Sequence, residues 1–502
     1  GWQGGEGLFE ATTVYVNAFT TIDANAIGNG HGGSVVLWST TKTTFAGNIQ
    51  ARGGANGGDG GKIEISSKDS VTYAGMVDAG SPKGAAGLFL LDPRNITIVD
   101  GPDIPNAFAA LELVDPVNGT SNGAGKNVTL LANGNIVVSD SSDDFAATNA
   151  GAVYLYNGTT GGLVAVVTGS SVDDQVGAPG ITSGVTALSN GNFVISSTYW
   201  DNGLATNAGA VTWMNGTTGA LSTGAIGGAV ATVNSVVGST TGDAAGYNAI
   251  VELSNGNFVI RNAIWDNGGA VDAGAVTWVN GSSGLLSTGA TGGAITSANS
   301  LVGTTTNDRV GNGTITALSN GNYVVISQFW NNTAAGASNA GAVTWGNGAT
   351  GTAGNVSIAN SLVGTTTDDG VGSAGVVALS NGNYVVSSTV WDNGAAINAG
   401  AVTWGNGAIG VKGAVSAANS LVGSSSFDTV GINGVIQVGA GNYVVASSGW
   451  DNGAVVDAGA VTWVNGAAGL SGTITSVNSL VGTTALDQVG IGGITVLSNG
   501  NY

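Results

Sequence analysis

Tryptophan residues recur at two positions of a repeating pattern, where their rings could stack on sugars or pack between repeats. One set is mostly followed by Asp-Asn, and the other ends an Ala-Val-Thr-Trp segment. Apolar residues that recur at a fixed interval are usually core residues, so packing between repeats is the favoured role of both sets. The Trp-Asp-Asn set is Trp200, Trp265, Trp330, Trp391 and Trp450, and the Val-Thr-Trp set is Trp213, Trp278, Trp345, Trp404 and Trp463.

The Trp-Asp-Asn set is the better candidate for ligand binding. It comes where a strand is expected to end, beside a glycine-containing loop, and such loops are where exposed sites concentrate. An aromatic ring with one face exposed can stack on a sugar. These five tryptophans are therefore the candidate ligand-binding residues, on the rim of the expected fold.

Aspartate recurs once per repeat in a D-x-x-G turn. A metal-binding role is one interpretation, which makes these residues weak metal candidates. A lone turn aspartate more often accepts a hydrogen bond from the backbone N–H two residues on, and this structural role is favoured. The aspartates after the tryptophans receive the same interpretation, because Asn331 replaces one of them. The turn aspartates are Asp174, Asp243, Asp308, Asp369, Asp428 and Asp487.

Groups that could perform catalysis are scarce. His31 is the only histidine, cysteine is absent, and Glu252 is the only glutamate after residue 126. A glycosidase needs two carboxyl groups about 5–10 Å apart with different pKa values. Near-identical repeats do not single out such a pair. The sequence therefore predicts a protein that is not an enzyme.

Composition excludes further classes of function. The net charge is −20, and residues 127–502 hold 17 Asp and one Glu against three Lys or Arg. Such a surface repels nucleic acid and anionic lipid. No apolar run reaches the length of about 18 residues that a membrane-spanning helix needs. At 42% hydrophobic residues the chain can build a large core, and its Val, Thr, Gly and Asn content predicts an all-β fold.

The segment 10–100 contains a short internal repeat, with a period of about 27 or 28 residues. IDANAIGNG at 22–30 recurs as IQARGGANG at 49–57, and VVLWS at 35–39 recurs as KIEIS at 62–66. Short alternating strands are separated by Gly- and Asn-rich corners without a two-residue hairpin signal. Strands that turn corners without reversing are typical of a parallel β-helix. The glycine cluster at 53–61 would supply corner residues with positive φ.

This segment resembles the distal coils of filamentous-haemagglutinin-type exoproteins. The resemblance is carried by VVLWSTTKTTFAGNIQARGGANGGDGGKIEISSK at 35–68 and by GLFLLDPRNITI at 87–98, with mild departures at Ile63, Ile65 and Ser67. It implies an outer-membrane two-partner-secretion transporter as the partner during export. It also implies an extracellular or bacterial outer-surface location. The chain starts at Gly1 and stops in mid-pattern, so we expect a piece of a longer protein.

From residue 127 the period lengthens to about 61 residues on average. The asparagine after the turn glycine stands at 135, 192, 257, 322, 383, 442 and 501. In the copy at 379–424, strands VVALS and YVVSS flank a first Asn-Gly turn. The strand AGAVTW and a second Asn-Gly turn follow, before a last strand that runs into SLVG. Asn-Gly between apolar runs indicates a type I′ hairpin.

Four antiparallel strands at this length are typical of a β-propeller blade. We therefore expect three parts: a β-helix segment at 1–100, a linker or edge strand at 101–126, and a β-propeller at 127–502. The propeller would contain six complete blades and the start of a seventh.

The copies also resemble the FG-GAP repeat of integrin-like propellers, most closely in NAGAVYLYNGTTG at 149–161. The family's calcium loop of D-x-D-x-D-G type is replaced here by Ser-Asn-Gly-Asn. That turn lacks the clustered carboxylates that Ca²⁺ requires. We therefore expect no cofactor, with Ca²⁺ possible but unsupported.

Together these observations predict that the protein is a non-enzymatic, adhesin-like exoprotein that attaches to surface glycans or proteins. One alternative is a structural subunit whose copies assemble into an extracellular filament or sheath. A second alternative is a lectin that binds glycans through the Trp-Asp-Asn rim. A polysaccharide-degrading enzyme is the least favoured hypothesis.

Overall fold

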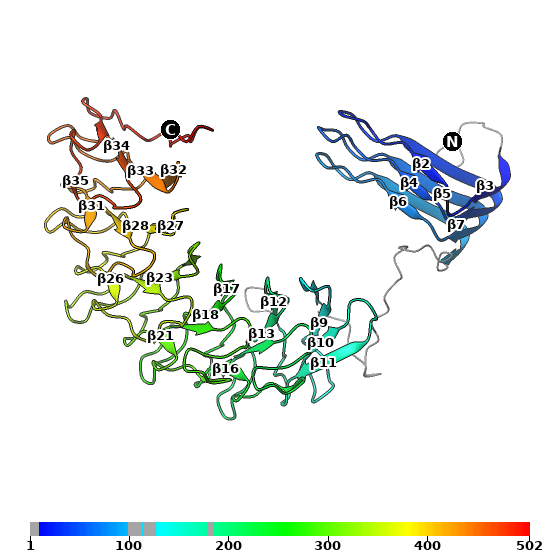
Figure 1. Ribbon diagram of the computed structural model, residues 1–502, viewed down its shortest axis with the longest axis horizontal. Coiled ribbons are helices and arrows are strands. Elements are labelled where there is room, and N and C mark those ends of the chain that lie inside the picture. Colours follow the sequence, from blue (N-terminus) through cyan, green and yellow to red (C-terminus); the bar gives the residue numbers. More distant parts are fainter. Residues whose placement is uncertain (1–9, 99–112, 114–126, 179–183) are drawn as a thin grey trace. The chain divides into compact units, whose positions relative to one another are not determined.

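The computed structural model describes residues 10–98, 113, 127–178 and 184–502 (Figure 1). These residues form strands and turns and no helix, so the fold is all-β as predicted. Accordingly, the described part of the chain holds no helix that is long and apolar enough to cross a membrane. Contacts divide the chain into unit 1, residues 1–111, and unit 2, residues 112–502. The expected linker at 101–126 lies almost wholly outside the described residues.

Unit 1 consists of two parallel sheets built by successive repeats. Parallel pairing without reversal follows from the corners that the sequence predicted between its strands. The larger sheet has the order β1 (Ala11–Val16), β3 (Ser34–Phe45), β5 (Lys62–Tyr73) and β7 (Leu88–Ile98), and the smaller has β2 (Thr21–Asp23), β4 (Asn48–Gln50) and β6 (Met76–Asp78).

The register of unit 1 keeps like residues stacked. Matching VVLWS with KIEIS places Val35 opposite Lys62, but Val35 pairs with Ile63, so the predicted match is wrong by one position. The observed register stacks Val35 on Ile63 and Leu37 on Ile65. Ile63 and Ile65 lie in the core of unit 1, against which Val35 and Leu37 pack.

The predicted positive φ explains only part of the glycine cluster at 53–61. Gly58 has φ 113°, as expected for a corner that a side chain would strain. Gly60 has a different reason to be glycine, because a Cβ there would lie 1.8 Å from the Ala79 carbonyl oxygen. Close approach of successive repeats therefore also selects glycine at these corners.

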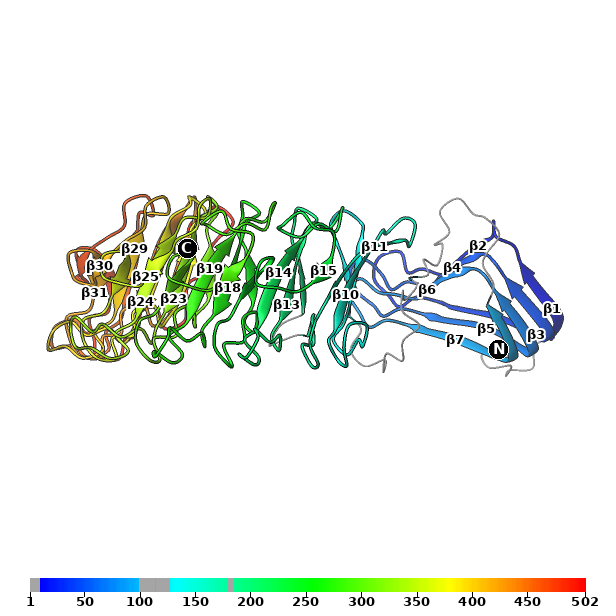
Figure 2. The ribbon, with the colours of Figure 1, turned by 90° about the horizontal axis from the view of Figure 1, so that it is seen from below.

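Unit 2 is built from repeated sheets that lie side by side in chain order (Figures 1 and 2). Within each sheet the first four strands pair as an antiparallel meander, which confirms the four strands predicted for 379–424.

Equivalent strands recur at the same position of each repeat. First strands are β8 (Asn127–Leu130), β12 (Val185–Ala187), β17 (Ile250–Glu252), β22 (Ile315–Ala317), β27 (Val376–Ala378) and β32 (Val435–Val438). Second strands are β9 (Ile136–Asp140), β13 (Phe193–Ser197), β18 (Phe258–Asn262), β23 (Tyr323–Ser327), β28 (Tyr384–Ser388) and β33 (Asn442–Ser447). Third strands are β10 (Ala152–Tyr156), β14 (Ala210–Met214), β19 (Ala275–Val279), β24 (Ala342–Gly346), β29 (Ala401–Gly405) and β34 (Ala460–Val464).

Fourth strands are β11 (Leu163–Thr168), β16 (Ser235–Val237), β21 (Ser300–Val302), β26 (Ser361–Val363), β31 (Ser420–Val422) and β36 (Leu480–Val481). A short fifth strand, which the sequence did not predict, crosses from each repeat to the sheet before it and pairs there in parallel with the fourth strand. These crossing strands are β15 (Gly228–Ala229), β20 (Gly293–Ala294), β25 (Gly354–Asn355), β30 (Gly413–Ala414) and β35 (Gly472–Thr473).

The hydrophobic cores lie between neighbouring sheets. One core joins Val324 and Ile326 of β23 with Val386 of β28 and with Trp391. Because the alternating side chains of a strand point to opposite faces, each sheet contributes to the core on either side of it. A repeat therefore completes its packing only against its neighbours, as expected for a repeat protein.

The two Asn-Gly turns differ from the predicted type I′ hairpins. In the first turn Leu379 and Asn383 pair around three loop residues, and only Gly382 has positive φ, at 87°. The second turn does not join neighbouring strands, because β29 ends at residue 405 and its partner β31 begins at residue 420. Its glycine, Gly407, is required for close approach: a Cβ there would lie 1.6 Å from the Gly382 carbonyl oxygen.

We predict that Gly407→Ala lowers the free energy of unfolding by about 1–3 kcal/mol, the usual cost of forcing atoms into a packed site. Gly269→Ala is the matched control, because a Cβ at Gly269 meets no atom within 4 Å. Urea denaturation followed by tryptophan fluorescence measures both variants. Equal midpoints for the two variants would contradict this explanation of the glycine.

Candidate functional site

The turn aspartates are hydrogen-bonded within and between repeats. Asp369 Oδ2 accepts the backbone N–H groups of Thr365 and Thr366 at 2.7 and 2.8 Å. Its Oδ1 accepts the backbone N–H of Asp392, in the next repeat, at 3.0 Å. The carboxylate is buried. Asp369 therefore fixes a turn and ties that turn to the following repeat.

Every turn aspartate accepts two such N–H groups from the residues three and four positions before it. The predicted bond from a residue two positions on is therefore wrong, although the structural role is supported. The bond to the next repeat recurs at Asp174, Asp243, Asp308 and Asp428. Asp487 accepts only the N–H groups of its own turn.

Burial changes the acidity of two of these groups. Burial raises the pKa of Asp369 above its ordinary value, and the bonds from the backbone of Asp392, Thr366 and Thr365 oppose that rise without cancelling it. The pKa of Asp428 is raised for the same reason. Desolvation disfavours the charged carboxylate more than its hydrogen bonds favour it.

The aspartates after the tryptophans also hold loops. Asp392 Oδ1 accepts the backbone N–H of Asn398 at 2.7 Å. In the longer loop of the fourth repeat, Asn331 Oδ1 accepts the N–H of Asn339 at 3.0 Å, so an amide replaces the carboxylate. The same bond forms at Asp201, Asp266 and Asp451. A negative charge is therefore not required at this position.

The Trp-Asp-Asn tryptophans pack between repeats, which was their favoured role, and the alternative role as exposed ligand-binding residues on a rim is wrong. Trp200, Trp265, Trp330, Trp391 and Trp450 are only 3–6% exposed and lie in the cores between sheets. Among the described residues, their indole Nε1 atoms have no hydrogen-bond partner. A sugar has no access to these rings, because the neighbouring sheet covers them.

The Val-Thr-Trp tryptophans join repeats through a glycine carbonyl. Trp404 Nε1 donates to Gly466 O at 2.9 Å, and the side-chain Nδ2 atoms of Asn381 and Asn383 donate to the same oxygen at 3.0 Å. Three donors of one repeat therefore meet at the second Asn-Gly turn of the next repeat. The arrangement recurs with Trp213, Trp278 and Trp345, which donate to Gly281, Gly348 and Gly407.

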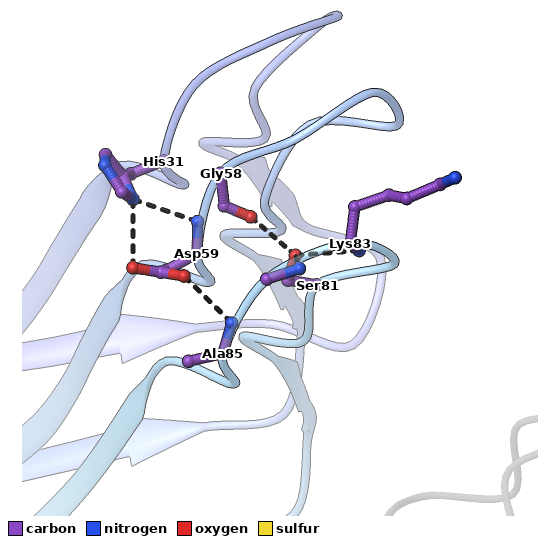
Figure 3. Close-up of polar contacts among 7 residues, drawn as sticks. His31, Gly58, Asp59, Ser81, Lys83 and Ala85 are labelled. Carbon is purple, nitrogen blue, oxygen red and sulfur yellow. Dashed lines mark hydrogen bonds and ion pairs between the residues drawn. The ribbon is translucent and has the colours of Figure 1, made fainter. Parts of the chain in front are cut away.

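A polar cluster on unit 1 brings together residues from successive repeats (Figure 3). His31 Nδ1 accepts the backbone N–H of Asp59 at 2.9 Å and lies 3.4 Å from Asp59 Oδ2. Asp59 Oδ1 accepts the N–H of Ala85 at 2.8 Å. Ser81 Oγ donates to Gly58 O at 2.6 Å, so its proton is directed away from the histidine. The cluster shapes corners and does not form a Ser-His-Asp triad, in which the serine must bond to the imidazole.

The described carboxylates of both units do not cluster as metal ligands. Within residues 10–98, 113, 127–178 and 184–502, no group of three or more His, Asp or Glu side chains is placed to hold a metal ion. The turn aspartates lie one per repeat, and their oxygens accept backbone N–H groups. The arrangement favours turn stabilisation over metal ligation at these positions.

Most of unit 2 matches a single family. Residues 130–178, 187–247, 252–312, 317–373, 378–432 and 437–491 match the repeat of unknown function DUF5650. No curated protein matches the sequence. Among solved structures, a luciferin-regenerating enzyme aligns with 72% of this chain and 94% of its own chain, at 11% identity and a TM-score of 0.20. That TM-score is too low to support an argument about fold or function.

We predict that Asp369→Asn lowers the free energy of unfolding by about 1–3 kcal/mol, because the amide keeps only one acceptor oxygen and its NH₂ group then faces a backbone N–H of Thr365, Thr366 or Asp392. The neighbouring substitution Asp368→Asn is the matched control, since Asp368 is exposed and asparagine tolerates its φ of 63°. Urea denaturation and amide hydrogen exchange at Thr365, Thr366 and Asp392 measure the effect. Equal exchange rates in both variants would contradict the role assigned to Asp369.

The raised pKa values predict that the contribution of Asp369 and Asp428 to the free energy of unfolding falls as the pH rises. A carboxyl group whose folded pKa is raised favours the folded state fully below its unfolded pKa, and this contribution is lost as pH rises through the folded pKa. Carboxyl-carbon NMR titration should give midpoints above 3.8 for Asp369 and Asp428. The urea-unfolded chain is the control, and midpoints equal to its values would contradict the effect of burial.

Proposed function

Because the chain belongs to the family of DUF5650 repeats, whose function is unknown, we propose its function from its own surface. It is a non-enzymatic, adhesin-like exoprotein that attaches to cells, matrix or host at the bacterial outer surface or outside the cell. One observation carries the proposal. The recurring polar residues bond neighbouring repeats, while a separate row of apolar side chains is exposed on the loops of four of the six repeats.

This apolar loop row lies between the second and third strands of four repeats. Leu204 is fully exposed, and Val271, Ile397 and Val456 are 52–54% exposed. Like loops of side-by-side sheets lie on the same edge, so the four residues share one edge of unit 2. Leu204 lies four residues after its tryptophan and the other three lie six residues after theirs, and the loop of the fourth repeat holds no large apolar residue. Several exposed apolar groups along one edge can bind a surface through several weak contacts at once, which raises the overall affinity.

The non-enzymatic part of the proposal rests on what the polar residues do. The turn carboxylates accept backbone N–H groups, and His31 Nδ1 accepts the N–H of Asp59. Near-identical repeats present the same groups several times, whereas an active site combines different groups at one place. No cofactor is part of the proposed function.

The proposal includes a finer description of the fold. Unit 1 would be the end of a parallel β-helix, which the parallel pairing of β3 with β5 supports. The sheets of unit 2 would be propeller blades, which the contacts of β22 with β17 and β27 support. Export through a two-partner-secretion transporter follows from the haemagglutinin resemblance of residues 35–98 alone.

The test is attachment of beads that carry the full chain to cultured epithelial monolayers and to bacterial cells. We predict that the combined variant Leu204→Ser, Val271→Ser, Ile397→Ser and Val456→Ser lowers attachment about tenfold or more, because multivalent contacts are lost together. Each single substitution should have a smaller effect. These side chains are exposed, so the fold is retained.

The matched control replaces two exposed apolar residues outside the row, Ile226→Ser and Val233→Ser. Attachment should be unchanged in this control. If the unaltered chain attaches to neither kind of cell, or if both variants attach equally well, the proposed function is wrong.

A further inference from the structure

One of the Val-Thr-Trp tryptophans lines an open pocket. The Trp404 pocket has a volume of about 410 Å³ and lies between the fifth and sixth repeats. Trp404 itself is half-buried, and its Nε1 is bonded to Gly466 O, so the ring is held in place. The other lining residues on which the argument depends are Asn406, Ile409, Ala418, Leu470 and Ser471.

The equivalent face of Trp213, in the second repeat, is closed. A cavity of only about 10 Å³ remains there, beside Trp213, Gly284 and Thr291. Trp213 is 6% exposed. Two repeats with the same tryptophan and the same bonds therefore differ by a pocket of several hundred Å³.

The length of one loop explains this difference. In the second repeat the chain runs from Asn215 to the crossing strand at Gly228, whereas in the fifth it runs only from Asn406 to Gly413. In the longer loop, Leu221 is buried in the core beside the sheet, and Ser222 Oγ donates to Thr291 O at 2.5 Å. The shorter loop of the fifth repeat has no counterpart of this covering segment, so the face of Trp404 stays uncovered.

The lining of the Trp404 pocket combines apolar surface with a few polar groups. The Trp404 ring, Leu470 and the 77% exposed Ile409 supply the apolar part. Asn406 Oδ1 accepts the N–H groups of Ala408 and Ile409, and its Nδ2 donates to no other group among the described residues. Ser471 supplies an exposed hydroxyl group. None of the lining residues carries a charge.

We propose that the Trp404 pocket binds an uncharged hexopyranose residue of a glycan. A pyranose ring has a face of C–H groups that packs on an aromatic ring, and hydroxyl groups that bond to amides and hydroxyls. The absence of charge in the lining favours a neutral sugar over an anionic one, which would be left unpaired there. The inference rests on the proposed attachment function and names the ligand class for one of its contacts.

The experiment is saturation-transfer NMR on the full chain with three probes. These are the methyl β-glycosides of D-glucose, D-galactose and N-acetyl-D-glucosamine at millimolar concentration. Ala418→Trp fills the pocket from an exposed position and leaves Trp404 in place. Ala298→Trp, at the equivalent exposed position of the third repeat, is the matched control. At least one glycoside should bind the unaltered chain and the control, and Ala418→Trp should weaken its binding at least tenfold.

A second variant, Ile409→Asp, tests the apolar part of the lining at an exposed position and should also weaken binding. If none of the three glycosides binds, or if Ala418→Trp binds as well as Ala298→Trp, the sugar pocket is wrong. Cell attachment that persists in that case leaves the proposed function standing. Glycoside binding without attachment to any cell overturns the proposed function and keeps the pocket.

Discussion

The convergence of three N–H donors on one glycine carbonyl is the interaction on which unit 2 depends. Gly466 O accepts hydrogen bonds from the side chains of Trp404, Asn381 and Asn383 in the preceding repeat. This Asn-Gly turn packs against the first turn of its own repeat. A Cβ at Gly466 would lie 1.6 Å from the Gly441 carbonyl oxygen, so only glycine allows this close packing. A buried polar group without a partner is costly, so the donors and the glycine recur together from the second repeat to the fifth. In the first repeat Leu155 replaces the tryptophan, and Gly216 O accepts only Asn133 and Asn135.

This constraint separates the residues that recur from those that can act on a ligand. The turn carboxylate of Asp369 is occupied by backbone N–H groups on both sides of a repeat boundary. Recurrence therefore marks the bonds that hold neighbouring sheets together. Binding chemistry is left to groups outside these bonds, which are the exposed apolar side chains such as Ile397 and the uncovered face of Trp404.

The sequence predicted the strands of unit 2 because their signals are local. Alternating apolar residues identified β27, β28, β29 and β31 at almost their observed positions. The crossing strands were missed because Gly413–Ala414 carries no strand signal and pairs only with another repeat. Recurrence at a fixed interval correctly favoured packing for Trp391, whereas its alternative role as an exposed residue was wrong, since a strand end is exposed only when no neighbouring sheet covers it.

The sequence by itself determined the all-β class, the two repeat lengths and the structural role of the turn aspartates, because these follow from spacing and turn chemistry along the chain. Only the tertiary structure decided which tryptophan face is covered. The shorter spacing of the later repeats is visible in the sequence. Its consequence is visible only in the structure, where the shorter loop after Asn406 leaves one face of Trp404 uncovered. Burial depends on residues brought together from different repeats, and a single repeat does not contain that information.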